Sequence, residues 1–306
     1  MKTNSLTSHK IYKERLKRGM LIYPKFRPYN LRFYLKPRQE LKIKKLISIL
    51  KNPIEYFKRL ITFYLFVKGS HPIRVGEDGN MTFSANQIKN GKKFLDKICT
   101  FVDKKRKKNT NNDNKYIISI EEVVKHPFIL DFALSEDLIK IASNYLKTVP
   151  ILYAVQLWQG KPNEIKAGSP CFHLDGLDTS CLRVYMYLND VSDDNGPFSI
   201  LPKPDSKIVL NKTKYSGGVI ADKEVYSLID CNLLNVIKGP KGTMLAGDTT
   251  QCFHYGSRIK KKERLVIIFT YASFYHNDPE IKLTKKVLRK YKPKNRIQKM
   301  LINGAK

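Results

Sequence analysis

Acidic residues are scarce in this sequence of 306 residues, which has 27 Asp and Glu against 57 Lys and Arg and a net charge of +30. The shortage lies at the two ends. Residues 1–75 hold 19 Lys and Arg against 3 acids, or +16, and residues 276–306 hold 10 against 2, or +8. Ends of this kind favour a polyanionic partner or surface, although charge that only keeps the chain solvated is an equal alternative.

Cysteine pairs and long apolar runs are also missing. The five cysteines form neither a CxxC pair nor an even-numbered framework, which favours a reduced, cytoplasmic setting. The most apolar stretch, residues 60–67, is much shorter than the roughly 20 residues of a membrane-spanning helix. The N-terminus has charges but no apolar segment, so we expect no secretory signal. We therefore expect a cytoplasmic protein, and peripheral attachment to a membrane surface stays open.

The glycine motifs of nucleotide-binding folds, GxGxxG and GxxxxGK[ST], are absent as well. From about residue 150, short β-rich runs alternate instead with turns rich in Gly, Pro, Asn and Asp. This texture favours a β-sandwich or barrel over a parallel α/β sheet. The strands expected from it are 151–158, 171–175, 182–188, 198–201, 242–246, 251–254 and 265–271.

Helices are expected before the β-rich part. Residues 40–67 predict two helices separated at Asn52-Pro53. A helix capped by Ser84 should run to an exposed loop at 104–114, and another should cover 127–147 with a restart at 135–137. The predicted organisation is a basic N-terminal extension with helices (1–83), a β domain with leading helices (84–275) and a basic C-terminal tail (276–306).

The helical region 41–67 has apolar residues on one stripe of each predicted helix, with lysines around them. Such a helix could lie along an anionic membrane surface. Its apolar stripe could equally pack on the β domain, with the lysines in solvent. The residues that form the stripes are Leu46, Ile49, Leu50, Phe57, Ile61, Tyr64 and Leu65.

Three side chains suit a metal ion: His173 and Asp175 in the run FHLDG, and His254 in FHYGS. Residues i and i+2 of a strand point to the same face, so His173 and Asp175 would present an imidazole and a carboxylate side by side. A second imidazole from a distant strand would complete two His and one carboxylate, which suits Fe(II) with open positions. A His-x-Asp pair alone arises by chance, and a turn-capping Asp beside a core His is the alternative.

The residues around these three carry a family resemblance. RVYMYLNDV (183–191), DNGPF (194–198), ILP (200–202), AGD (246–248) and HYGSR (254–258) follow the His-x-Asp in order, and ERLVIIF (263–269) comes last. Over residues 150–275 the chain resembles the phytanoyl-CoA dioxygenase-like family of Fe(II)/2-oxoglutarate-dependent oxygenases. The resemblance implies a mainly β fold with flanking helices and a double-stranded β-helix (jelly-roll) core.

The resemblance also implies an activity. Fe(II) would be bound by His173, Asp175 and His254, with 2-oxoglutarate and O2 as co-substrates and ascorbate as a stimulant. The expected reaction is hydroxylation of a small-molecule or lipid-type substrate. Asp175, the position that halogenating relatives lack, argues against halogenation.

Arg264, ten residues after His254, opens the last apolar strand. The resemblance implies that its guanidinium holds the remote carboxylate of 2-oxoglutarate in a bidentate contact. The alternative is an exposed Arg264 paired with Glu263. Arg258 lies in a polar turn and ranks lower for this role. Gln156 and Ser257 could hydrogen-bond the co-substrate, and for Gln156 a strand-surface position is at least as good an interpretation.

Two other functions stay open. Basic ends that carry Tyr and Phe suggest a nucleic-acid-directed oxygenase, but the spacing of His254, Arg258 and Arg264 does not match the nucleic-acid demethylases. A non-catalytic jelly-roll module on a polyanionic surface is the other alternative, and the intact set of His173, Asp175, His254 and Arg264 counts against it.

Overall fold

The computed structural model describes residues 37–108, 115–116, 118, 120–162, 170–256, 258–273 and 290–302. The aromatic-bearing N-terminal segment and much of the basic C-terminal tail, both predicted to contact polyanions, lie outside these residues.

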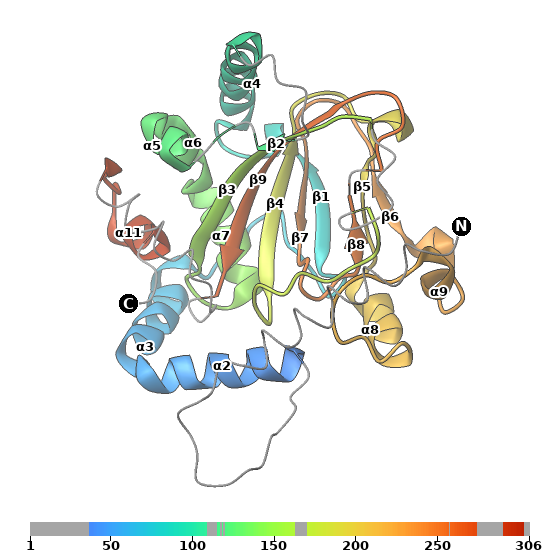
Figure 1. The fold of residues 1–306 in the computed structure, drawn as a ribbon. Coiled ribbons are helices and arrows are strands. Elements are labelled where there is room, and N and C mark those ends of the chain that lie inside the picture. The colour runs from blue at the N-terminus through green and yellow to red at the C-terminus, as the bar shows by residue number, and fades with distance from the viewer. Residues whose placement is uncertain are drawn as a thin grey trace, which may run out of the picture.

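Two antiparallel sheets form the centre of the molecule (Figure 1). The large sheet has the order β1 (Asn80–Ser84), β7 (Thr243–Gly247), β4 (Cys181–Tyr187), β9 (Arg264–Ala272), β3 (Ile151–Gly160) and β2 (Lys115–Tyr116). The small sheet has the order β6 (Asn235–Ile237), β5 (Phe198–Ile200) and β8 (His254–Tyr255). The predicted β core with flanking helices is confirmed, but the fold is not mainly β, because more of the described residues lie in helices than in strands.

Alternation along the central strands separates two cores. On β4, Leu182, Val184 and Met186 face the helices, while Tyr185 and Tyr187 face the small sheet. Strand β9 alternates in the same way. The space between the sheets is filled by Tyr185, Tyr187, Phe198, Ile200, Ile237, Leu245, Val266 and Ile268, with Trp158 beside them.

Helices cover the outer face of the large sheet and flank the small one (Figure 1). Phe94 stacks on Phe132 at 4.0 Å between ring centroids, and both rings meet Phe269 of β9. On the large sheet lie α4 (Gly91–Lys108), α5 (Ile120–Lys125), α6 (Pro127–Ala133), α7 (Glu136–Leu146) and α11 (Arg296–Ile302). Beside the small sheet lie α8 (Lys203–Lys212) and α9 (Asp222–Tyr226). Three 3-10 turns cover Ala85–Gln87, Asp193–Asn195 and Cys231–Leu233.

Three consecutive helical segments precede β1: α2 (Pro37–Lys51), α3 (Pro53–Thr62) and the π-helix η1 (Phe63–Val67). The predicted interruption at Asn52-Pro53 is confirmed. Helix α2 passes below the lower ends of the strands, and α3 turns up beside β3 (Figure 1). The alternative in which the apolar stripe packs on the β domain is wrong, because of its seven residues only Ile49 is packed against the core, at Ile151.

Several predicted boundaries are wrong in detail. Residues 171–175 form no strand beyond isolated bridges at Phe172 and His173, since Asp175 turns away to bond Thr249. Residues 251–253 lie in a turn, so β8 begins only at His254. Ser84 caps a 3-10 turn, and α4 begins later, at Gly91. The predicted domain boundary between residues 83 and 84 falls inside β1.

Arg59 fixes α3 on the body of the protein. Its buried guanidinium donates to the backbone carbonyls of Val149 at 3.0 Å, Pro150 at 3.1 Å and Met300 at 2.7 Å, and to Glu55 at 3.1 Å. These bonds join α3 to the start of β3 and to α11, so this face of α3 is the inward one.

Arg59→Met should lower the free energy of unfolding by about 3 kcal/mol, because it leaves three buried carbonyls without their donor. Lys58→Met, at the neighbouring exposed position, should change it by less than about 0.5 kcal/mol. Urea denaturation followed by circular dichroism measures both. Equal effects of the two substitutions would show that the Arg59 bonds do not hold α3.

Candidate metal centre

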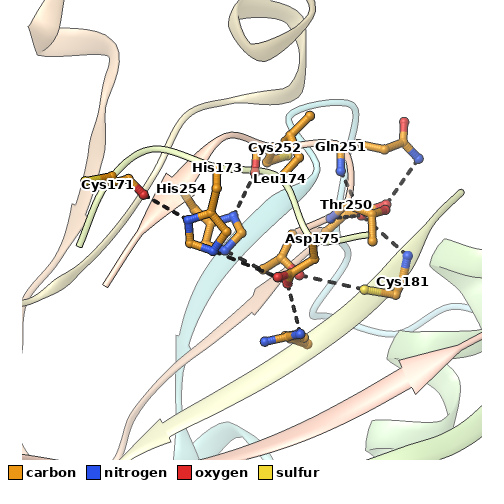
Figure 2. A network of polar contacts seen from close by, with 12 residues as sticks. Cys171, His173, Leu174, Asp175, Cys181, Thr250, Gln251, Cys252 and His254 are labelled. Atoms are coloured by element: carbon orange, nitrogen blue, oxygen red, sulfur yellow. Dashed lines mark hydrogen bonds and ion pairs between the residues drawn. The ribbon is translucent and has the colours of Figure 1, made fainter. Parts of the chain in front are cut away.

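His173 and His254 are paired by their own backbones. Each donates its N–H to the carbonyl of the other at 3.1 Å, as an isolated antiparallel bridge beside β8. Residues opposite each other in such a pair project their side chains to the same face. The two imidazoles therefore lie side by side, with ring centroids 4.3 Å apart, and both point toward Asp175 (Figure 2).

The Nδ1 atom of each histidine is hydrogen-bonded to a backbone carbonyl. Nδ1 of His173 lies 2.9 Å from the carbonyl of Cys171, and Nδ1 of His254 lies 3.1 Å from that of Cys252. A carbonyl only accepts, so each Nδ1 must carry the hydrogen, and each Nε2 keeps its lone pair. Both imidazoles are thus held in the tautomer that binds a metal through Nε2.

The Nε2 atoms face the Asp175 carboxylate. His173 Nε2 lies 3.9 Å from Oδ1 and His254 Nε2 lies 3.9 Å from Oδ2. These distances are too long for hydrogen bonds, so the ligating atoms surround a common space instead of satisfying one another. Ligating atoms of all three residues lie within 4.8 Å of one another, the one group of three or more metal-binding side chains found in the described part of the chain.

Arg183, from the inner face of β4, holds Asp175 ionised. Its Nη2 lies 2.9 Å from Asp175 Oδ2. Burial would raise the pKa of Asp175, but Arg183, the two histidines and a hydrogen bond from Thr249 outweigh it and lower the pKa. Oδ2 is nevertheless buried and accepts no hydrogen bond of normal geometry from the described residues. An ionised carboxylate that faces two imidazole Nε2 atoms is suited to bind a metal cation together with them.

His254 is kept neutral. Burial, together with the nearby His173 and Arg183, lowers the pKa of His254 to about 3, against the opposing effect of Asp175. Its imidazole is therefore unprotonated throughout the neutral range, and a metal does not have to displace a proton from it. Two imidazoles and one carboxylate are the donor set of mononuclear non-haem Fe(II) centres.

Asp248 organises the turn between β7 and β8, a role that the sequence did not reveal. Its buried carboxylate accepts hydrogen bonds from Tyr145 at 2.9 Å, from Ser180 at 2.6 Å and from the backbone and side chains of Thr250 and Gln251. The next residue, Thr249, accepts the Asp175 N–H at 2.9 Å. The AGD motif was visible in the sequence, but its donors come from three separate segments.

Arg264 is buried at the start of β9, between the two sheets. Its Nη1 donates to the carbonyl of Gly196. Burial lowers the pKa of Arg264, and the nearby Tyr187 and Tyr185 act in the opposite direction. The alternative of an exposed Arg264 paired with Glu263 is wrong, because Glu263 pairs with Arg106 at 2.7 Å.

Arg258 is engaged elsewhere. Its two terminal nitrogens bond Asp222 at 2.7 Å each, and its Nε donates to the carbonyl of Pro170 at 2.6 Å. The guanidinium also lies over the Tyr255 ring, 3.3 Å from its centroid. These contacts join α9 and the segment before His173 to β8. Ser257, the other candidate of this turn, lies outside the described residues.

Gln156 lies on the inner side of β3. The strand register puts it in one row with Ile268 and Tyr185. The ring of Tyr185 contacts Phe198 at 4.5 Å, and Phe198 stacks on His254 at 5.4 Å. Gln156 therefore faces the space between the sheets rather than the outer surface, and Phe198 lies between its row and His254.

A small cavity of about 80 Å³ adjoins Asp175. Helix α2 closes one side of it with Leu41 and Lys42, and Lys45 of the same helix donates to Thr179 at 3.1 Å. The other lining residues include Leu174, Tyr215 and Thr250. The inward side of α2 is thus part of the surroundings of the metal centre.

Comparison with known proteins identifies no family model and no curated protein that matches the chain. Among solved structures, the chain is similar to the apo form of EctD from S. alaskensis (15% identity, TM-score 0.49, covering 69% of this chain and 80% of that one). It is also similar to HygX from Streptomyces hygroscopicus with nickel and 2-oxoglutarate bound (12%, 0.46, 71% and 86%). A third is SnoN, the non-heme alpha ketoglutarate dependent epimerase from nogalamycin biosynthesis (13%, 0.44, 72% and 84%). With TM-scores below 0.5, these likenesses carry no argument about the activity of this chain.

Asp248→Asn should lower the free energy of unfolding by about 2 kcal/mol or more, because an amide cannot accept all the donors that now converge on the carboxylate. It should also weaken Co(II) binding at the centre by about tenfold or more, since Thr249 positions Asp175. Asp230→Asn is the control, because Asn caps a turn about as well as Asp does. Urea denaturation and Co(II) titration measure the two effects. Unchanged metal affinity in a destabilised Asp248→Asn protein would separate this turn from the metal centre.

Proposed function

We propose that the chain is an Fe(II)/2-oxoglutarate-dependent oxygenase with a double-stranded β-helix core, related to the phytanoyl-CoA dioxygenase-like family. One observation carries the proposal: two histidines with Nδ1 bound to backbone direct their Nε2 atoms at a largely buried carboxylate without hydrogen-bonding to it. When Fe(II), 2-oxoglutarate and O2 are bound, they supply the oxidising power for hydroxylation of a C–H bond. The protein supplies the position and the surroundings.

The residues have separate roles in this proposal. His173, Asp175 and His254 hold the metal on one side, which leaves positions for the co-substrates. Arg183 compensates the charge of Asp175 and orients its carboxylate. Phe198, stacked on His254, excludes water from the inter-sheet side of the centre.

Arg264 is assigned to the remote carboxylate of 2-oxoglutarate. It is buried on the same inter-sheet side as Phe198, and Gly256, two residues after His254, leaves space beside it: a Cβ there would lie 3.4 Å from Arg264 Nη2 and from Phe198. A buried guanidinium is stabilised by a bidentate carboxylate partner. Gln156, in the neighbouring row, would hydrogen-bond the co-substrate or substrate. The substrate class that we propose is a small molecule or a lipid-type molecule.

The Fe(II)-loaded protein should form succinate from 2-oxoglutarate in the presence of O2 and ascorbate, in a screen of candidate substrates. His173→Ala and His254→Ala should abolish both succinate formation and Co(II) binding, because each removes a ligand. His126→Ala removes a histidine outside the centre and should retain both. A protein that binds metal through these residues but yields no succinate would favour the non-catalytic alternative, and turnover with Zn(II) without O2 would assign a different reaction.

Arg264→Leu should raise the KM for 2-oxoglutarate about tenfold or more, because it removes a charge-assisted bidentate contact. Arg258→Leu should raise it much less, since Arg258 is already engaged by Asp222. Steady-state kinetics over a range of 2-oxoglutarate concentrations decide between them, with thermal denaturation as a check that both proteins are folded. The reverse ranking would assign the co-substrate contact to Arg258.

A further inference from the structure

An apolar face covers the outward side of α2, α3 and η1. Nine of the fourteen large hydrophobic residues that are exposed in the described part of the chain lie between residues 43 and 66, so exposure is concentrated in this one segment. Their exposed fractions range from 41% to 83%. The nine residues, called the α2–η1 face below, are Ile43, Leu46, Leu50, Ile54, Phe57, Ile61, Tyr64, Leu65 and Phe66.

Helical spacing groups eight of these nine residues on one side of each helix. In α2 they recur at i, i+3 and i+7, beginning at Ile43, and in α3 and η1 at i, i+3, i+7, i+10 and i+11, beginning at Ile54, while Phe66 follows at i+12, outside this spacing. Such spacing produces a single stripe along a helix. A stripe of this kind normally faces the protein core, and here it faces solvent.

The opposite sides of these helices also hold buried residues, so a rotation of the helices does not explain the exposed stripe. Arg59, Phe63 and Val67 occupy the opposite side of α3 and η1, and all three are buried. Arg59 donates to three backbone carbonyls of the body. In α2, the inward side holds Leu41 and Lys42 at the cavity and Lys45 on Thr179. The inward sides are therefore occupied, and the exposed stripe is a second apolar side.

The charges of this helical segment are mainly positive. Residues 41–68 contain six lysines, two of them (Lys42 and Lys45) on the inward side of α2, and a single acid, Glu55, which pairs with Lys58 and Arg59. A second copy of the chain docked symmetrically on this face would bring like charges together. An anionic bilayer accepts both features, because apolar side chains enter the acyl region while lysines remain at the headgroups.

We propose that the α2–η1 face docks the protein on the surface of an anionic lipid bilayer. The attachment is peripheral, since none of the described helices has the length and hydropathy needed to cross a membrane. Because α2 has this face on one side and lines the cavity beside Asp175 with the other, docking would hold that cavity about one helix diameter from the bilayer. This last step favours a lipid-type substrate and rests on the proposed oxygenase function.

Flotation of the full chain with vesicles tests the docking face, without added metal, so that the result is independent of the oxygenase proposal. The protein should bind vesicles of phosphatidylcholine mixed with phosphatidylserine, bind phosphatidylcholine alone weakly, and lose binding as salt rises. Ile54→Glu combined with Leu65→Glu should weaken binding at least tenfold. Lys51→Gln should weaken it about fivefold, the effect of one basic residue at an anionic surface.

Helix α8 offers matched controls, because Ile208 and Lys212 are exposed there and are not part of the α2–η1 face. Ile208→Glu and Lys212→Gln should bind vesicles as the unaltered protein does, and circular dichroism should show that all variants are folded. Equal loss of binding in both sets would overturn the proposal, as would absence of binding to the mixed vesicles. Self-association in sedimentation that Ile54→Glu abolishes, without vesicle binding, would assign the face to a second copy instead.

Discussion

The structure depends on the backbone bridge between His173 and His254. These residues come from distant parts of the chain, and their reciprocal hydrogen bonds at 3.1 Å fix the distance and the direction of both side chains at once. The carbonyls of Cys171 and Cys252 then set the ring tautomers. The geometry of the metal centre thus follows from main-chain pairing beside the small sheet, and the large sheet adds the charge of Arg183.

Two carboxylates lie near that bridge, and each has its own polar partners. Asp175 is balanced by Arg183, and the turn that holds the Asp175 N–H is itself built on the buried carboxylate of Asp248. Each carboxylate has donors from more than one element, so neither can shift without disturbing the other. Arg264 and Arg258 have different structural roles. Arg264 is buried between the sheets, whereas Arg258 joins α9 to β8.

Much of the β part could be predicted from the sequence, since β3, β4, β7 and β9 combine apolar residues with clear turn signals at both ends. The three candidate metal ligands could be named, because their motifs are local. Asp248 could not be assigned a role, since its partners Tyr145 and Ser180 lie far away in the sequence. Arg183 could not either, because its pairing with Asp175 depends on the path of the irregular chain between them. The outward stripe of α2 and α3 was ambiguous for another reason. Helical periodicity shows that apolar residues share a side but not which side faces the core, and here a charged residue, Arg59, points inward with Phe63 and Val67.

Backbone carbonyls fix both imidazoles, and this determines how far the sequence around such a centre can change during evolution. Each Nδ1 bonds the carbonyl of the residue two positions earlier in its own chain, at Cys171 and at Cys252. Every amino acid offers that carbonyl, so the side chains at these positions can be exchanged without altering the tautomer. A centre of this kind constrains the amino acid at very few positions of the sequence. Proteins can therefore drift far apart in sequence while the same atoms still meet.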